Sequence, residues 1–327
     1  MKVFIYIFID FIITLFILFS LEKLSSRFNV LDFAEVDTRK IHTEHIPILG
    51  GVGIFFGLFI GMIISGYFDK TLGAIVAGSL LVIIGLIDDS FDLSPIIKLI
   101  FQLITAALLL LVTDLVPELF PIPALNWIFG ILFITAIINA SNMNDGFDGQ
   151  LSMMALIFLS FTAFILKFPF FSYFIVPILV FLFFNLPKAR MFLGDAGSML
   201  IGVIVAYSGL LLMAYEGFWK GMFIFCIAYY IPLFDLAFAV IRRSLKKKSI
   251  FSADKGHLHH IFLEKYPDTT KVLWIFSLAA ILLAGIGFLS SFINNQWIFL
   301  IFNLIILAFT VIIIVSILKK GLFKEVK

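Results

Sequence analysis

Runs of about twenty apolar residues recur along nearly the whole chain, and they restrict its fold more than any other feature. A helix needs roughly 20 such residues to cross about 30 Å of hydrocarbon. Hydrophobic residues make up 62% of the sequence and charged residues 13%, whereas soluble domains have roughly 45–50% and about 25%. One water-soluble core cannot bury this excess. We therefore predict an all-α, polytopic transmembrane helical bundle.

Eleven segments are predicted to be membrane spans, and together they are expected to form a single integral membrane domain over residues 1–327. Their approximate limits are 3–24, 46–66, 72–87, 95–113, 124–140, 150–167, 171–186, 197–214, 219–241, 272–290 and 297–318. The first run is interpreted as a retained helix rather than a signal peptide, because it carries Asp10 and is followed by further spans. Asp10 itself is interpreted as a tolerated polar residue within the bundle.

The distribution of Lys and Arg between the predicted loops indicates the orientation of the bundle. All but four of the 23 basic residues fall on one side, and the exceptions are Lys2, Lys70, Lys167 and Lys220. Because cytoplasmic loops are enriched in Lys and Arg, the basic side is predicted to be cytoplasmic. An odd number of spans then places the N-terminus outside and the C-terminus in the cytoplasm.

Acidic residues and histidines gather on the same predicted side, in four separate loops. They are Asp88, Asp89, Asp92, Asp145, Asp148, Asp195 and Asp254, with His42, His45, His257, His259 and His260. A channel or a structural protein has no need of such a gathering. An enzyme that acts on an anionic, metal-bound substrate does.

The first of five polar blocks ends the third span, where Asp88 and Asp89 are adjacent. Adjacent carboxylates beside hydrocarbon repel each other and persist when a cation, a proton or a lysine compensates them. Mg²⁺ is the natural cation, since it prefers hard oxygen ligands and phosphates. Lys98 follows at the mouth of the fourth span, where it is either a snorkelling anchor or part of a site.

The second block, from Asn139 to Gly149, packs amides, carboxylates and glycines between two spans. Glycines permit tight turns with positive φ, so that Asn142, Asp145 and Asp148 can converge. A simple hairpin between helices needs fewer turn formers. The block lacks the spacing and the final Glu of an EF-hand, so the sequence favours a binding site of another kind.

The remaining three blocks add basic groups and helix starts. Asp195 opens a helix, where it is either an N-cap or part of a phosphate site. The histidines of segment 254–260 lack the usual spacing of zinc enzymes, and binding of a diphosphate is favoured over zinc. In segment 37–53, Lys40 precedes a glycine-rich span entrance that is not a P-loop, and the glycines are interpreted as helix-packing residues.

Together the five blocks resemble the polyprenyl-phosphate N-acetylhexosamine-1-phosphate transferases, which transfer a sugar 1-phosphate from a UDP-sugar to undecaprenyl or dolichyl phosphate. The matches run in family order from about Asp37 to His260. The sequence His257-Leu258-His259-His260 looks like the bacterial undecaprenyl-phosphate N-acetylglucosamine-1-phosphate transferases of O-antigen, common-antigen and teichoic-acid synthesis. The phospho-N-acetylmuramoyl-pentapeptide transferases of peptidoglycan synthesis, which usually show three consecutive histidines, are the alternative.

The resemblance implies residue roles and a cofactor. Mg²⁺, or Mn²⁺ in its place, would be held by Asp195 with Asn142 or Asp145 nearby. Asp88 and Asp89 would position or deprotonate the lipid phosphate and are the expected catalytic residues. Substrate contacts are expected from Lys40, Lys98, Asn139, Asp148, His257, His259 and His260.

The resemblance also implies partners and a location. The expected partners are a UDP-sugar donor, undecaprenyl phosphate and the lipid bilayer, with no nucleic acid; a homo-oligomer is left open. The expected location is the bacterial inner (cytoplasmic) membrane, with the active site on its cytoplasmic face. A transporter or channel is the alternative of another class. It requires acids at mid-membrane, for which only Asp10 and Asp235 are candidates.

Overall fold

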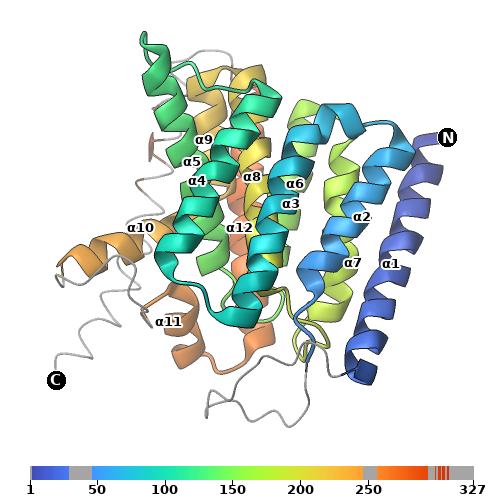
Figure 1. Ribbon diagram of the computed structural model, residues 1–327. Helices are drawn as coiled ribbons and strands as arrows, with labels where there is room; N and C mark the ends of the chain where they lie inside the picture. Colours follow the sequence, from blue (N-terminus) through green and yellow to red (C-terminus); the bar gives the residue numbers. More distant parts are fainter. Residues whose placement is uncertain are drawn as a thin grey trace, which may run out of the picture.

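The computed structural model of this chain is a bundle of helices (Figure 1). It describes residues 2–28, 46–245 and 256–293, with isolated positions between 299 and 308. Every regular element within these residues is helical, which confirms the all-α class. The helices are α1 (Lys2–Phe28), α2 (Gly50–Ser65), α3 (Phe68–Phe91), α4 (Pro95–Thr113), α5 (Pro123–Met143), α6 (Gln150–Leu166), α7 (Phe171–Asn185), α8 (Gly194–Glu216), α9 (Phe218–Ala228), α10 (Tyr230–Leu245), α11 (Leu258–Lys265) and α12 (Thr269–Ser291).

Several of these helices are long and apolar enough to cross a membrane. Within the described residues, α1, α3, α4, α5, α8 and α12 meet both conditions, which gives 6 spans, or 7 if α9 and α10 form one broken span. Helices α2, α6 and α7 are apolar but shorter. The chain is therefore a polytopic membrane protein. The eleventh predicted segment, 297–318, lies largely outside the described residues, so the count of eleven stays a prediction.

The predicted span 219–241 is divided between two helices. Helix α9 ends at Ala228 and α10 begins at Tyr230, and their axes differ by 85°. Pro232 has no N–H to donate to the Ala228 carbonyl, and proline is tolerated only in the first turn of a helix. The chain therefore starts a new helix here. Figure 1 shows α10 projecting sideways from the bundle.

Helix α8 forms the centre of the bundle, and its apolar window is completely buried. Glycines bring neighbouring helices against its first turn. A Cβ on Gly85 of α3 would lie 2.3 Å from the Cα of Ala196, and one on Gly51 of α2 would lie 2.2 Å from the backbone nitrogen of Gly197. This contact supports the interpretation of the glycine-rich block as packing residues. It also places the end of α3 beside the start of α8.

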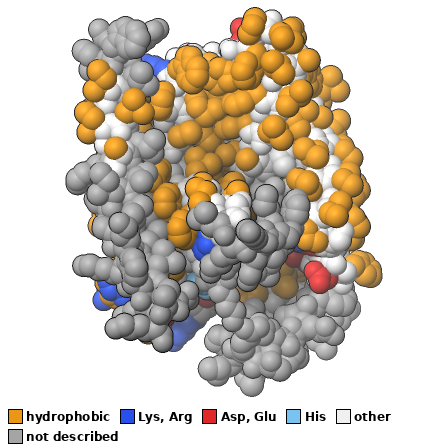
Figure 2. Space-filling view, turned by 90° about the vertical axis from the view of Figure 1, so that its left-hand side faces the viewer, with side chains coloured by type: hydrophobic (Ala, Val, Ile, Leu, Met, Phe, Trp, Pro, Cys, Tyr) orange, Lys and Arg blue, Asp and Glu red, His pale blue; other side chains and the backbone are white. Residues whose placement is uncertain are grey.

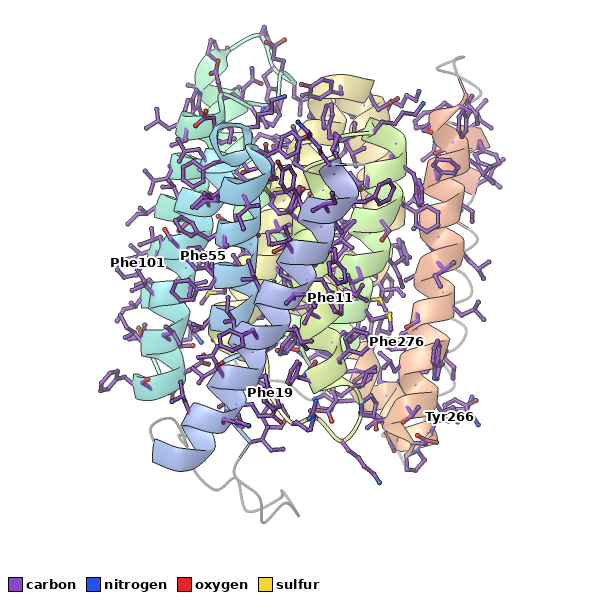
Figure 3. All side chains as sticks on the ribbon, turned by 90° about the vertical axis from the view of Figure 1, so that its right-hand side faces the viewer. Phe11, Phe19, Phe55, Phe101, Tyr266 and Phe276 are labelled. Atoms are coloured by element: carbon purple, nitrogen blue, oxygen red, sulfur yellow. The ribbon has the colours of Figure 1, made fainter. Side chains whose placement is uncertain are left out.

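The two ends of the bundle differ in chemistry. Helices α3 and α5 end, and α4, α6, α8 and α11 begin, at the lower end in Figure 1, which we call the polar end. In Figure 2, hydrophobic side chains cover the upper part of the visible face, whereas charged side chains gather mainly below. The four exceptional lysines named above lie at helix ends away from the polar end. Figure 3 shows apolar side chains such as Phe11 and Phe19 along the length of α1.

Asp10 lies in the half of α1 that is remote from the polar end, where it is fully buried. Its Oδ1 accepts a hydrogen bond from the Thr14 hydroxyl at 3.5 Å. A Cβ on Gly61 of α2 would lie 2.7 Å from the same oxygen. The absence of a side chain at Gly61 therefore makes room for a carboxyl group between two packed helices.

Candidate active site

Lys98 forms ion pairs with two carboxylates at the polar end. Its Nζ lies 2.8 Å from Oδ2 of Asp88 and 3.1 Å from Oδ2 of Asp195. These residues come from the end of α3, the start of α4 and the start of α8, so the first and third sequence blocks meet at one ammonium group. The second oxygen of Asp88 accepts the backbone N–H of Leu93 at 2.8 Å. Lys98 is thus a member of the site rather than only an interfacial anchor.

Asp89 supports the first turn of α8. Its two carboxylate oxygens accept the backbone N–H groups of Asp195 at 2.9 Å and of Ala196 at 3.4 Å. The residue at the N-cap position of α8, Leu193, has no side-chain group that could do this. A carboxylate at a helix N-terminus is stabilised by unpaired N–H groups and by the helix dipole. Asp89 therefore fixes Asp195 relative to Asp88.

Gly194 makes the approach of Asp89 possible. Its φ is +72°, and a Cβ there would lie 2.6 Å from Oδ2 of Asp89. Glycine adopts positive φ without the steric penalty of other residues. The glycine immediately before Asp195 is thus required both by the backbone and by the carboxylate that packs against it.

The loop after α5 adds a fourth carboxylate, that of Asp145. Asn142, in the last turn of α5, donates from Nδ2 to the Ser198 hydroxyl at 3.1 Å, which ties the end of α5 to α8. Burial, and then the negative charges of Asp195, Asp148 and Asp89, together raise the pKa of Asp145 to about 7. Among the described residues its carboxylate has no hydrogen-bond partner. Asp145 is therefore a group that a bound cation would stabilise.

Asp148 and Asn139, which were also predicted for the site, make hydrogen bonds that connect neighbouring segments of the bundle. Asp148 accepts the backbone N–H of Ala189 at 3.2 Å and so ties the second block to the segment before α8. Asn139 donates from Nδ2 to Oε1 of Gln102 on α4 at 2.6 Å, and also to the Thr135 carbonyl. Asn139 therefore points into the interface between α4 and α5, and no contact among the described residues joins it to the carboxylates.

The histidine segment is held by a residue that the sequence interpretation did not assign to the site. His257 Nδ1 lies 3.1 Å from Oδ2 of Asp235, and the other oxygen of Asp235 accepts the Leu258 N–H at 2.8 Å. Asp235 is 1% exposed. A lone acid in an otherwise apolar segment was the available signal. Because it pairs with His257, it no longer supports an ion path at mid-membrane.

His259 lies on the turn of the second block. A Cβ on Gly146 would be 2.4 Å from the His259 ring, and the ring of His257 is parallel to it at a centroid distance of 5.6 Å. The ring of His260 is 4.2 Å away. Burial, then the neighbouring His260, lowers the pKa of His259 to about 4. His259 is therefore neutral near pH 7, and its ring brings the second and fourth blocks into direct contact.

The oxygen ligands predicted for Mg²⁺ fit a hard cation in their chemistry. Asp195, Asp145 and the Asn142 carbonyl are hard oxygen donors, and the charges of Asp195 and Asp145 already repel each other. Mg²⁺ commonly takes one or two carboxylates together with water and substrate phosphates. Within residues 2–28, 46–245 and 256–293, no group of three or more His, Cys, Asp or Glu side chains is arranged to bind a metal by itself. A protein-only zinc site at the histidines therefore has no support in this part of the chain.

Lys40 lies outside the described residues, as do His42, His45, Asp254 and Lys255. The other residues predicted for the site all lie within them. Asp88, Lys98 and Asp195 contact one another directly, while Asp89, Asn142, Asp145 and Asp148 surround them. The histidine segment contacts the loop after α5, where the ring of His259 packs against Gly146.

The chain resembles known transferases over most of its length. The model of glycosyl transferase family 4 matches residues 71–213. A Bacillus subtilis (strain 168) protein named "probable undecaprenyl-phosphate N-acetylglucosaminyl 1-phosphate transferase" is 35% identical over 245 residues, which cover 68% of this chain and 67% of that protein.

Two further relatives are undecaprenyl-phosphate alpha-N-acetylglucosaminyl 1-phosphate transferases. The one from Salmonella typhi is 29% identical over 331 residues, covering 91% of this chain and 87% of its own. The one from Thermotoga maritima is 29% identical over 254 residues, covering 78% of this chain and 80% of its own.

Proposed function

The chain belongs to glycosyl transferase family 4, and from this premise we propose that it transfers N-acetylglucosamine 1-phosphate from UDP-N-acetylglucosamine to undecaprenyl phosphate. An oxygen of the lipid phosphate would form a bond to the phosphorus next to the sugar. The bond between that phosphorus and the bridging oxygen would break, and UMP would leave with the electron pair. The observation that carries the proposal is Lys98, which is held between Asp88 and Asp195 at the polar end.

Charge neutralisation is the main requirement of this reaction, because donor and acceptor are both anionic. Lys98 can release one of its carboxylate partners and donate to a phosphate oxygen instead. Catalysis of phosphoryl transfer consists mostly of positioning and electrostatic stabilisation. One ammonium group fixed by two carboxylates from α3 and α8 is pre-organised for this work.

Asp195, Asn142 and Asp145 are the residues that would hold Mg²⁺ or Mn²⁺. When bound, the ion would supply positive charge to the diphosphate and to the departing UMP. Neighbouring residues hold two of these ligands in place. Asp89 fixes the backbone of Asp195, and Ser198 fixes Asn142. Asp195 and Asn142 are thereby attached to one helix start, with Asp145 close by in the chain.

Asp88 is proposed to orient the acceptor rather than to attack the donor. One of its oxygens is bound to Lys98 and the other to the Leu93 N–H, so neither is available as a nucleophile without breaking a contact. A phosphate monoester has a second pKa of about 6 and is largely dianionic near pH 7. The lipid phosphate therefore needs no general base, and we favour direct attack over a two-step route through Asp88.

The proposed setting is the bacterial cytoplasmic membrane. In this setting the polar end faces the cytoplasm, where nucleotide sugars are made, and the N-terminus lies outside. The bias of Lys and Arg toward the polar end supports this orientation. The product would be the first lipid-linked intermediate of a cell-envelope polysaccharide such as O-antigen, common antigen or teichoic acid.

The proposal is tested with purified protein, Mg²⁺, undecaprenyl phosphate and a panel of radiolabelled UDP-sugars. We expect a labelled lipid and one equivalent of UMP from UDP-N-acetylglucosamine. UDP-N-acetylmuramoyl-pentapeptide should give no product. Transfer from the pentapeptide donor alone would assign the chain to peptidoglycan synthesis, and absence of transfer from every donor would exclude the enzyme reading.

A further inference from the structure

The bend between α9 and α10 places a buried acid behind the histidine segment. Asp235 lies in the first half of α10 and is 1% exposed. Its Oδ2 and Oδ1 contact His257 Nδ1 at 3.1 Å and the Leu258 N–H at 2.8 Å. A carboxylate with so little solvent exposure persists only when it is paired. Both of its oxygens are directed at the chain segment that begins α11.

A second residue of α10 holds the same segment. Arg242 donates from a guanidinium nitrogen to the Gly256 carbonyl, and it is 7% exposed. Residues seven positions apart lie on one face of a helix, so Asp235 and Arg242 contact three consecutive residues, 256–258, from the same side. Arg242 is therefore part of the protein interior and not only a basic flank near lipid headgroups. Helix α10 thus acts as a rigid support for the histidines.

The contact with Asp235 determines which nitrogen of His257 faces the substrate. A carboxylate accepts a hydrogen bond, so Nδ1 carries a proton and Nε2 is the nitrogen left to meet a ligand. The parallel ring of His259 restricts the plane of the imidazole. We propose that Asp235 is a positioning residue, which orients His257 so that Nε2 faces the diphosphate of the UDP-sugar. This inference rests on the function proposed above.

The proposed pairing gives His257 a defined chemical state when the donor is bound. With Nδ1 donating to Asp235, Nε2 donates to a phosphate oxygen only when the ring is an imidazolium. Negative charges would then lie on both sides of the ring, Asp235 on one side and the diphosphate on the other. Carboxylate–histidine pairs orient ligand-binding histidines in the same way at metal sites.

The variant Asp235→Asn tests the orientation of His257 without removing the hydrogen bond at the start of α11. In Asp235→Asn, the amide oxygen can still accept the Leu258 N–H, so the start of α11 keeps its hydrogen bond. The amide cannot reproduce the charge that faces Nδ1. Asp235→Asn should therefore lower kcat/KM for the donor by about 10- to 100-fold, the usual effect of losing the partner of a functional histidine. Asp235→Glu should recover part of the loss.

A double-mutant cycle with His257→Ala shows whether Asp235 acts through the histidine. If it does, adding Asp235→Asn to His257→Ala should change kcat/KM by less than about 2-fold, because residues that act as a unit are not additive. The matched control is Asp10→Asn, which alters another fully buried acid, remote from the polar end. We expect it to transfer at the wild-type rate. Full additivity in the cycle, or a wild-type rate for Asp235→Asn, would overturn the proposal.

The ¹⁵N chemical shifts of His257 in the intact protein provide a readout that does not depend on turnover. We expect a protonated Nδ1, either in the neutral ring or in the imidazolium. A neutral ring with its proton on Nε2 would overturn the proposal, and this holds even if Asp235→Asn does not fold. If the wild-type protein transfers no sugar phosphate, the proposed function fails, whereas the shifts still decide the pairing of Asp235 with His257.

Discussion

At the residue scale, the site depends on the balance of charge between Lys98 and the several carboxylates around it. Among the described residues, Lys98 is the cation that contacts Asp88 and Asp195, and Asp89, Asp145 and Asp148 add negative charge nearby. Without that ammonium group the carboxylates would repel one another and the incoming phosphates. Lys98 thus compensates the two carboxylates that it pairs with, and in the proposed function the same ammonium group would receive the substrate phosphates.

We predict that Lys98→Met lowers the single-turnover rate by roughly 10²- to 10³-fold, the usual effect of removing one electrostatic donor from an active site. Lys98→Arg should retain more activity, since it keeps the charge but not the shape. Lys220→Met, which removes a lysine at the opposite end of the bundle and its ion pair with Glu216, is the control and should transfer normally. Equal rates for Lys98→Met and Lys220→Met would exclude Lys98 from the chemistry.

Removal of divalent metal is predicted to abolish transfer. The protein in EDTA should be inactive, Mg²⁺ or Mn²⁺ should restore it, and Zn²⁺ should not, because the proposed ligands are hard oxygens. Asp195→Asn should require more Mg²⁺ for half-maximal rate and be slower by orders of magnitude at saturation. Full activity of Asp195→Asn in metal-free buffer would rule out the proposed ligand.

The sequence singles out acidic residues where they stand together in one short segment, and their roles stay predictions. Asp88 with Asp89, and Asp145 with Asp148, stand out as neighbouring acids beside apolar spans. Asp235 did not, because His257 lies 22 positions further on and across a bend. A pairing of that kind depends on how two helices are placed, and no local pattern encodes it.

At the scale of elements, the site is built by helix starts and ends that glycines allow to approach. The end of α3 reaches the start of α8 because Gly85 has no side chain to meet the backbone of Ala196. This contact sets the separation between Asp88 and Asp195. Close packing through small residues is a common way for membrane helices to associate, and here it carries the active-site geometry.

We predict that Gly85→Ala destabilises the protein by about 1–3 kcal/mol, the usual effect of overpacking, and also slows transfer. The added Cβ would lie 2.3 Å from main-chain atoms of Ala196, which cannot move without shifting α8. Gly285→Ala on α12 is a matched change in a helix, where the nearest atom is 3.9 Å away. Thermal inactivation in detergent should be faster for Gly85→Ala only. Equal stability of the two variants would contradict the packing argument.

Helix positions were predictable because the thickness of the bilayer sets the length of apolar runs. The observed α4 covers the same residues as the predicted segment 95–113. The bend at Tyr229 was not predicted, because residues on both sides of it are equally apolar. Only Pro232 signals a break. Because proline is tolerated in the first turn of a helix, its position alone does not show where one helix ends and the next begins.

At the scale of the whole molecule, chemistry is confined to one end of the bundle. Every described residue of the site lies at the polar end, and most Lys and Arg residues lie on that side in the chain order. A membrane enzyme with a water-soluble nucleotide donor requires such an end. The arrangement also leaves the remaining length of the bundle for contact with lipid.

The orientation is predicted to place Glu264 in the cytoplasm and Ala124 outside. Glu264 is exposed on α11 at the polar end, and Ala124 is exposed at the start of α5 at the opposite end. In a background lacking Cys226, Ala124→Cys should react with a membrane-impermeant thiol reagent in intact cells. Glu264→Cys should react only after the membrane is opened. The reverse pattern would invert the topology.

The proposed reaction is tested most directly by following each phosphorus of the donor. The protein is mixed with undecaprenyl phosphate, Mg²⁺ and UDP-N-acetylglucosamine labelled with ³²P either next to the sugar or next to uridine. We predict that the label next to the sugar appears in the lipid and that the label next to uridine appears in UMP. Transfer of labelled sugar without its phosphorus, or a lipid carrying the label next to uridine, would contradict the bond cleavage proposed for this site.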